Sequence, residues 1–171
     1  MFLRGIKKKS AEKYISKALL AVRNLNSNKI KTLGIVVDAT ICNNFSHIKN
    51  VSTLFNIPEK NIHIIYYHPD KKLKETFEGN VYADADLSFK GNLKNEVVNQ
   101  FIATPFDCLL SFYDEDKLLL NLVSVKSKAQ FKIGFASIND KINDFSVATN
   151  INDISTFTSE LKKYLTILNK I

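Results

Sequence analysis

The chain has 171 residues, carries a formal net charge of +7 and is 45% hydrophobic. This length predicts one domain over residues 1–171 and excludes a small fold that needs a disulfide or a metal ion for its stability. No apolar run approaches the roughly 18 residues of a membrane span, and the start MFLRGIKKK lacks the apolar region of a secretory signal, so we expect a cytoplasmic protein. Cys42 and Cys108 lie in apolar surroundings without a metal-ligand spacing, which predicts reduced thiols in the core.

Positive charge is concentrated at the amino end. Residues 1–31 contain nine basic residues against Glu12 alone, a charge of +8, which leaves −1 for the remainder. The basic residues are Arg4, Lys7, Lys8, Lys9, Lys13, Lys17, Arg23, Lys29 and Lys31. A basic end on a nearly neutral body suggests an acidic partner such as RNA, a ribosome or an anionic membrane. The alternative is an ordinary solvated face of lysines.

The first predicted element is an amphipathic helix over residues 8–27. Lysines lie opposite an apolar stripe of helical period, formed by Ala11, Tyr14, Ile15, Ala18, Leu19, Val22 and Leu25. We expect this basic helix to pack on the core, although the same pattern would let it lie on a membrane surface.

Two buried strands are predicted next, at residues 32–38 (TLGIVVD) and 61–67 (NIHIIYY). A helix is expected between them, closed by Pro58. Its apolar positions are Phe45, Ile48, Val51 and Leu54 or Phe55, and its candidate caps are Asn43, Asn44 and Ser46.

Residues 68–80 are polar and contain Pro69 and Gly79, which predicts a loop or an outlying hairpin. Short strands are expected at residues 81–83 and 86–89. A helix should follow and end at Thr104 and Pro105, with an apolar side made of Leu93, Val97, Val98 and Phe101.

Residues 106–135 carry the clearest pattern in the chain. The apolar run 106–113 predicts a buried parallel strand, and the acids Asp114, Glu115 and Asp116 predict a cap and a negative first turn for the helix after it. That helix is apolar at Leu118, Leu119, Leu122, Val123, Val125 and Ala129. Residues 131–135 then return as a second strand, after a length that suits a right-handed parallel crossover.

The carboxyl end predicts a short edge strand at residues 145–149 and a final helix capped by Asp153. Together the elements predict a three-layer, Rossmann-like α/β sandwich. Its sheet should be mostly parallel, with the 106–113 strand at or near the centre and helices on both faces. The basic helix within residues 1–31 should pack on this domain or extend from it.

Ligands of open α/β sheets bind beyond the carboxyl ends of the strands. This rule selects a candidate pocket made of Asp38, Thr40, Asn44, His68, Tyr113, Asp114 and Ser137. Residues 38–44 contain no glycine and so cannot form a glycine-rich phosphate loop. Asp38 is a candidate catalytic group or a turn residue, and the acids at 114–116 are candidate cation ligands or partners of the helix dipole.

No cofactor and no metal ion is expected. The three histidines, His47, His63 and His68, share no metal-ligand spacing, and a strand would place His63 and His68 on opposite faces. No nucleophile elbow, CxxC or HExxH motif is present.

Two family resemblances extend this interpretation. The strand FDCLLSF, a leucine-rich helix, a short basic segment and FKIGF resemble the amino-terminal half of heptosyltransferase-type glycosyltransferases. In that family an acid follows the first strand, a position that Asp38 matches, although the glycine beside it is missing here. Over the full chain, from the lysine-rich first helix through DFSV to ELKKYL, the sequence resembles a family of short uncharacterised bacterial α/β proteins. That resemblance implies the fold and the cytoplasmic location but no activity.

Three functional hypotheses result. A complete fold without a catalytic motif favours a non-catalytic binding or adaptor module with a protein partner. The alternative is a degenerate glycosyltransferase-like or nucleotide-binding enzyme domain, in which the pocket residues must converge. A third hypothesis is weak binding of nucleic acid or an anionic membrane through Lys7, Lys8, Lys9, Lys13 and Lys17. Because Tyr14 should face the core, base stacking is not expected.

Overall fold

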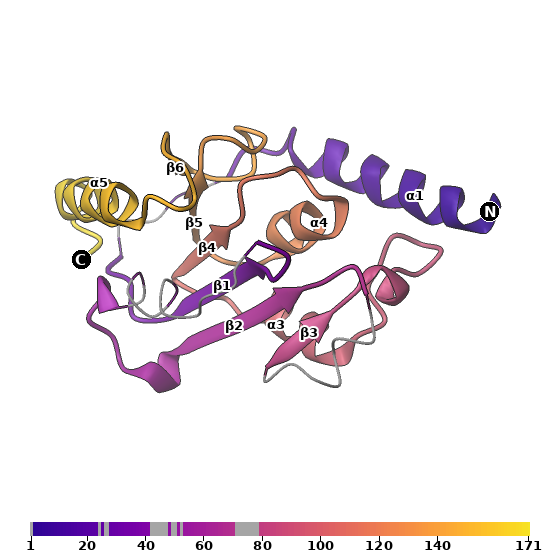
Figure 1. Ribbon diagram of the computed structural model, residues 1–171, viewed down its shortest axis with the longest axis horizontal. Coiled ribbons are helices and arrows are strands. Elements are labelled where there is room, and N and C mark those ends of the chain that lie inside the picture. Colours follow the sequence, from indigo (N-terminus) through magenta and orange to yellow (C-terminus); the bar gives the residue numbers. More distant parts are fainter. Residues whose placement is uncertain are drawn as a thin grey trace.

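The computed structural model describes residues 2–23, 25, 28–41, 48, 51, 53–70 and 79–171, with the backbone alone for 2–4. The described strands form one six-stranded sheet in the order β3-β2-β1-β4-β5-β6, and every pairing is parallel (Figure 1). They are β1 (Leu33–Asp38), β2 (Ile62–Tyr67), β3 (Asn80–Tyr82), β4 (Cys108–Phe112), β5 (Phe131–Phe135) and β6 (Phe145–Val147). The predicted parallel sheet is confirmed, with β1 and β4 as its central pair and β6 at an edge.

Helices cover both faces of the sheet, which confirms the three-layer sandwich (Figure 1). On one face lie α3 (Glu96–Ala103) and α4 (Leu118–Lys126), packed on a core that includes Val36, Leu109 and Tyr113. On the other face α5 (Ile154–Ile167) packs over Phe112 and Phe135. Central strands covered in this way are apolar on both sides, and all six residues of β1 are buried.

Gly34 in β1 is required by this packing. A Cβ atom at this position would lie 2.7 Å from the ring of Phe106 and 3.0 Å from that of Phe101. Both rings are buried, and they pack 4.9 Å apart, measured between centroids. The missing side chain therefore makes room for the aromatic pair that joins α3 to the sheet.

The first helix differs from its prediction. Helix α1 (Phe2–Ala18) contacts α4 and buries Ala11 completely, but it ends nine residues before the expected position 27. Val22 and Leu25, predicted to pack, are 93% and 52% exposed. The helical period is a local property, whereas burial needs an element opposite the side chain. Here the chain is held instead by Arg23, whose Nη2 atom donates to the carbonyl oxygens of Ala129 and Gln130.

Two further predictions are corrected or lie mostly outside the described residues. Residues 86–89 form no strand: a short 3-10 helix, η3 (Asp84–Asp86), precedes an isolated antiparallel bridge between Leu87 and Leu93. A second 3-10 helix, η1 (Glu59–Asn61), leads into β2. The helix expected near residues 45–55 and its caps are mostly undescribed, although Ile48, Val51 and Phe55 are buried on the α5 face. Among the described helices none has the length and hydropathy to cross a membrane.

Candidate functional site

The strand order reverses between β1 and β4, and ligands of this topology bind beyond the carboxyl ends of the two strands at such a reversal. Four polar side chains lie at or directly after the carboxyl ends of the strands. The register places Asp38 of β1 opposite Tyr67 of β2, and Tyr67 opposite Tyr82 of β3, while Tyr113 directly follows β4. The three tyrosines pack in the core beneath α3 and α4. Asp38 lies on the same side, because it is two residues from Val36 in that core.

Asp38 is fully buried and paired with Lys117, the residue that precedes α4. The Nζ atom of Lys117 lies 2.5 Å from Oδ2 of Asp38 and 2.8 Å from the hydroxyl of Thr40. The other oxygen, Oδ1, accepts from the backbone N–H and from the hydroxyl of Thr40, at 2.9 and 2.6 Å. Three of the roughly four acceptor positions of a carboxylate are thereby occupied inside the protein. This pair compensates the buried charge and links β1 to α4.

The neighbouring tyrosines are held as neutral hydroxyls. Tyr67 donates to Oδ1 of Asp84 at 2.8 Å, and Tyr113 donates to Ser124 at 2.9 Å. The hydroxyl of Tyr82 is completely buried and has no hydrogen-bond partner among the described residues. Burial raises the pKa of Tyr82, and Tyr113, Tyr67 and Asp38 nearby raise it further. These groups can donate hydrogen bonds but do not serve as bases near neutral pH.

The remaining residues of the predicted pocket do not join Asp38 and Thr40 in any described contact. Asn44 lies outside the described residues. His68 is half-buried, and its Nδ1 accepts from the backbone N–H of Asp70 at 3.0 Å, within its own turn. Asp114 is half-buried, and Ser137 is exposed. Lys117, Tyr67 and Tyr82, which were not predicted from the sequence, are the residues that lie near Asp38.

The acids before α4 act differently from the prediction. The helix begins with Lys117 as its cap and has no acid in its first turn. Asp116 instead accepts from the amide of Asn121 at 2.7 Å and from the backbone N–H of Asn139 at 3.2 Å, which ties this loop to the one after β5. Among the described residues, no group of three His, Cys, Asp or Glu side chains is arranged to hold a metal ion.

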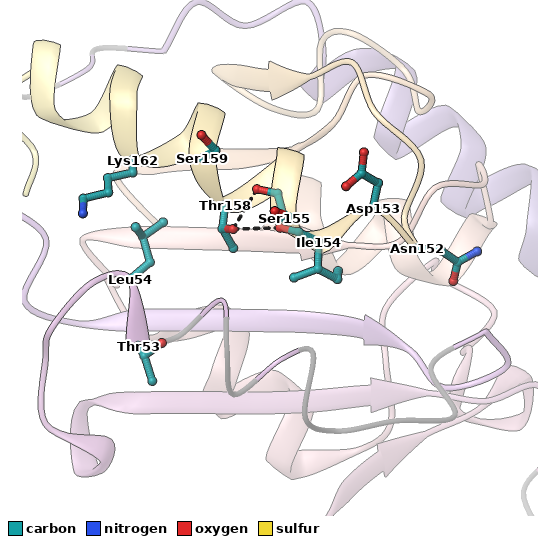
Figure 2. Close-up of a pocket in the computed structure, with 9 residues that line it drawn as sticks. All are labelled: Thr53, Leu54, Asn152, Asp153, Ile154, Ser155, Thr158, Ser159 and Lys162. Carbon is teal, nitrogen blue, oxygen red and sulfur yellow. Dashed lines mark hydrogen bonds between the residues drawn. The ribbon is translucent and has the colours of Figure 1, made fainter.

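A groove of about 680 Å³ opens on the opposite face of the molecule, between the start of α5 and Thr53 and Leu54 (Figure 2). Its polar groups do not converge on one point. Asp153 caps α5 by accepting from the N–H of Thr156, and the hydroxyl of Thr158 donates to the carbonyl of Ile154. Figure 2 shows Ser159 and Lys162 pointing in different directions. The groove therefore offers a surface without a defined set of ligand contacts.

A second candidate surface is basic. Lys9, Lys13 and Lys17 are exposed and follow one another at intervals of four residues, so they form a row along α1. Lys8 is exposed beside this row, and Lys7 is half-buried with its Nζ atom 4.8 Å from the ring centroid of Phe89. No ion pair joins these lysines to an acid in the described part of the chain. We call Lys7, Lys8, Lys9, Lys13 and Lys17 the basic row.

Comparison with known proteins places this fold in a family. A family model described as a family of unknown function, DUF6913, matches residues 7–168. The chain belongs to this family. The DUF6913 match begins inside α1 and ends one residue after α5, so it covers the whole described sheet, Asp38, Lys117 and the basic row. No curated protein and no solved structure matches, so the comparisons add nothing to the glycosyltransferase resemblance.

Proposed function

We propose that this protein is a non-catalytic binding module that holds a polyanionic partner on the basic row. The observation that carries the proposal is that α1 buries Ala11 against the body of the protein and turns Lys9, Lys13 and Lys17 outward, with no acidic partner for them in the part of the chain that the structure describes. Like charges four residues apart repel one another and destabilise a helix. A bound polyanion would remove this repulsion.

The surroundings of Asp38 support the non-catalytic part of the proposal. A general base needs an oxygen within reach of a substrate proton. Asp38 is fully buried, and its carboxylate already accepts from Lys117 and twice from Thr40. The acids Asp114, Glu115 and Asp116 around the start of α4 would also repel a phosphate group.

The proposal is tested by the salt dependence of binding to a labelled DNA duplex. Four bound phosphates should give a log–log slope of about −3.6, since each contributes about −0.9. A variant with Lys8, Lys9, Lys13 and Lys17 changed to glutamine should lose most of this slope. The matched control changes four exposed lysines elsewhere, Lys29, Lys31, Lys60 and Lys162, and should keep it. The proposal would be wrong if both variants lost the same part of the salt slope, or if the protein did not bind the duplex at low salt.

A second candidate is a nucleotide-binding or glycosyltransferase-like domain. It is favoured by the strand order β3-β2-β1-β4-β5-β6, which is that of dinucleotide-binding folds, with Asp38 at the reversal point. Thermal-shift measurements with nucleotides and nucleotide sugars distinguish the two functions. We expect no shift. A shift that disappears when Asp38 and Lys117 are replaced together by Asn and Met would favour the enzyme.

A further inference from the structure

Two exposed aromatic side chains accompany the basic row. Tyr14 of α1 is 43% exposed, so it lies at the margin of the packed face rather than in the core as expected. Phe89, in the loop before α3, is 48% exposed. A lysine ammonium group lies over each ring: Lys126 is 3.7 Å from the centroid of Tyr14, and Lys7 is 4.8 Å from that of Phe89. Aromatic faces within a lysine-rich surface are what single-stranded nucleic acids use for base stacking.

The loop that carries Phe89 is fixed against α1. Gly91 has a φ of +71°, and a Cβ atom there would lie 3.0 Å from the backbone nitrogen of Ala11. The turn is closed by hydrogen bonds from the N–H of Ser88 to the carbonyl of Asn92 and from the N–H of Asn92 to the hydroxyl of Ser88. Phe89 and the exposed Lys90 therefore lie beside α1, the helix that carries Tyr14.

A cavity of about 410 Å³ lies beside Tyr14, within the size range of small-ligand sites. Its lining includes the amides Asn92 and Asn99 and the apolar side chains of Leu93 and Ile102. Lys126 donates to the side-chain oxygen of Asn92, and the amide nitrogen of Asn99 donates to the carbonyl of Leu93. Both amides are thus oriented, and amide groups of this kind hydrogen-bond to the edges of bases.

We infer that this surface binds single-stranded nucleic acid. The phosphates contact the basic row, one base stacks on Tyr14 beside Asn92 and Asn99, and another stacks on Phe89. A duplex cannot make these contacts, because its bases are already stacked on one another. A membrane is disfavoured, because Ala11 and Ile15 of α1 pack against the core while lysines face outward. The inference rests on the proposed function and names the class of its partner.

The test compares fluorescence-anisotropy binding of three probes at equal salt. They are a labelled RNA single strand of roughly 12 nucleotides, the same sequence as a duplex, and vesicles of mixed phosphatidylcholine and phosphatidylglycerol. The single strand should bind most tightly. Tyr14→Ala and Phe89→Ala should each weaken its binding about 5- to 150-fold and leave duplex binding and the salt slope unchanged. Tyr14→Phe should restore the affinity, because it keeps the aromatic face.

Tyr164 provides the matched control. It is 38% exposed on α5 and has Lys163 5.1 Å from its ring centroid, but it lies away from the basic row. Tyr164→Ala should bind RNA as the unmodified protein does. Equal binding of single strand and duplex, unaffected by Tyr14→Ala, would overturn the inference while leaving a polyanion-binding protein. Binding to vesicles alone would also overturn it, and binding to none of the probes would remove the proposed function as well.

Discussion

At the scale of single residues, two of the buried charged groups in the described residues, Asp38 and Lys132, are compensated in different ways. Asp38 meets the ammonium group of Lys117, which is itself 26% exposed. Lys132 is buried without an ion pair in the described contacts, and its Nζ atom donates to the carbonyls of Ser124 and Val125 at the end of α4. A cation is favoured at a helix carboxyl end, but burial opposes its charged form.

Removing the partner of Asp38 should destabilise the fold. In Lys117→Met the carboxylate remains buried with only Thr40 to stabilise its charge. We expect the free energy of unfolding to fall by about 1–3 kcal/mol, measured by urea denaturation. Lys141→Met, at an exposed lysine, is the control for loss of a charge and should have little effect. An equal result for the two variants would mean that the pair contributes nothing to stability.

Lys132 should make stability depend on pH. Burial lowers its pKa to about 7, with Arg23 adding to the decrease and Asp144 opposing it. In the unfolded chain its pKa is about 10.4. Between these values the unfolded chain binds more protons, so the contribution of Lys132 to stability rises with pH and is lost toward pH 7. Its slope is at most about 1.4 kcal/mol per pH unit.

The measurement is urea unfolding of the protein and of Lys132→Met from about pH 7 to about pH 10, the window between the two pKa values. As the pH rises, the unmodified protein should gain stability relative to Lys132→Met. The difference between their free energies of unfolding should therefore shrink or change sign. Lys128→Met, at an exposed neighbour, should show no such trend. If the free energies of unfolding of the protein and of Lys132→Met changed with pH in parallel, Lys132 would stay charged in the fold.

At the scale of elements, the contact between β1 and α3 depends on a missing side chain. Gly34→Ala would bring a Cβ atom within 2.7 Å of the Phe106 ring, which has no solvent-exposed side toward which to move. We expect a loss of about 1–3 kcal/mol from overpacking, read from the urea midpoint. Gly5→Ala in α1, where a Cβ atom would meet no neighbour within 4 Å among the described residues, should be neutral or slightly stabilising. Recovery of stability in the double variant Gly34→Ala/Phe106→Leu would assign the loss to this contact.

At the scale of the whole molecule, the fold distributes the positive charge unevenly over the surface. The basic row lies on one side of the molecule because α1 lies along α4 (Figure 1). The other side carries α5 and the groove near Thr53. A molecule with such an uneven charge distribution is attracted to polyanions from a distance, and added salt should weaken this attraction.

Much of the fold was predictable because its signals are local. The apolar run of β4, the return of the chain in β5 and the cap that Asp153 provides for α5 each depend on residues close in sequence. These signals report the period and the ends of elements, and therefore the fold class. They also located Asp38 and Thr40, because a residue at the end of a buried strand is recognisable from the strand itself.

The sequence by itself therefore determined most of the elements, the parallel sheet and the basic amino end. Only the tertiary structure decided what those residues contact. It pairs Asp38 with Lys117, 79 positions later, because the strand order makes β1 and β4 neighbours. It ties Asp116 to Asn139 instead of to the helix dipole, and it leaves Tyr14 exposed beside Lys126. Such contacts join segments far apart in the chain, so no local periodicity or capping pattern encodes them.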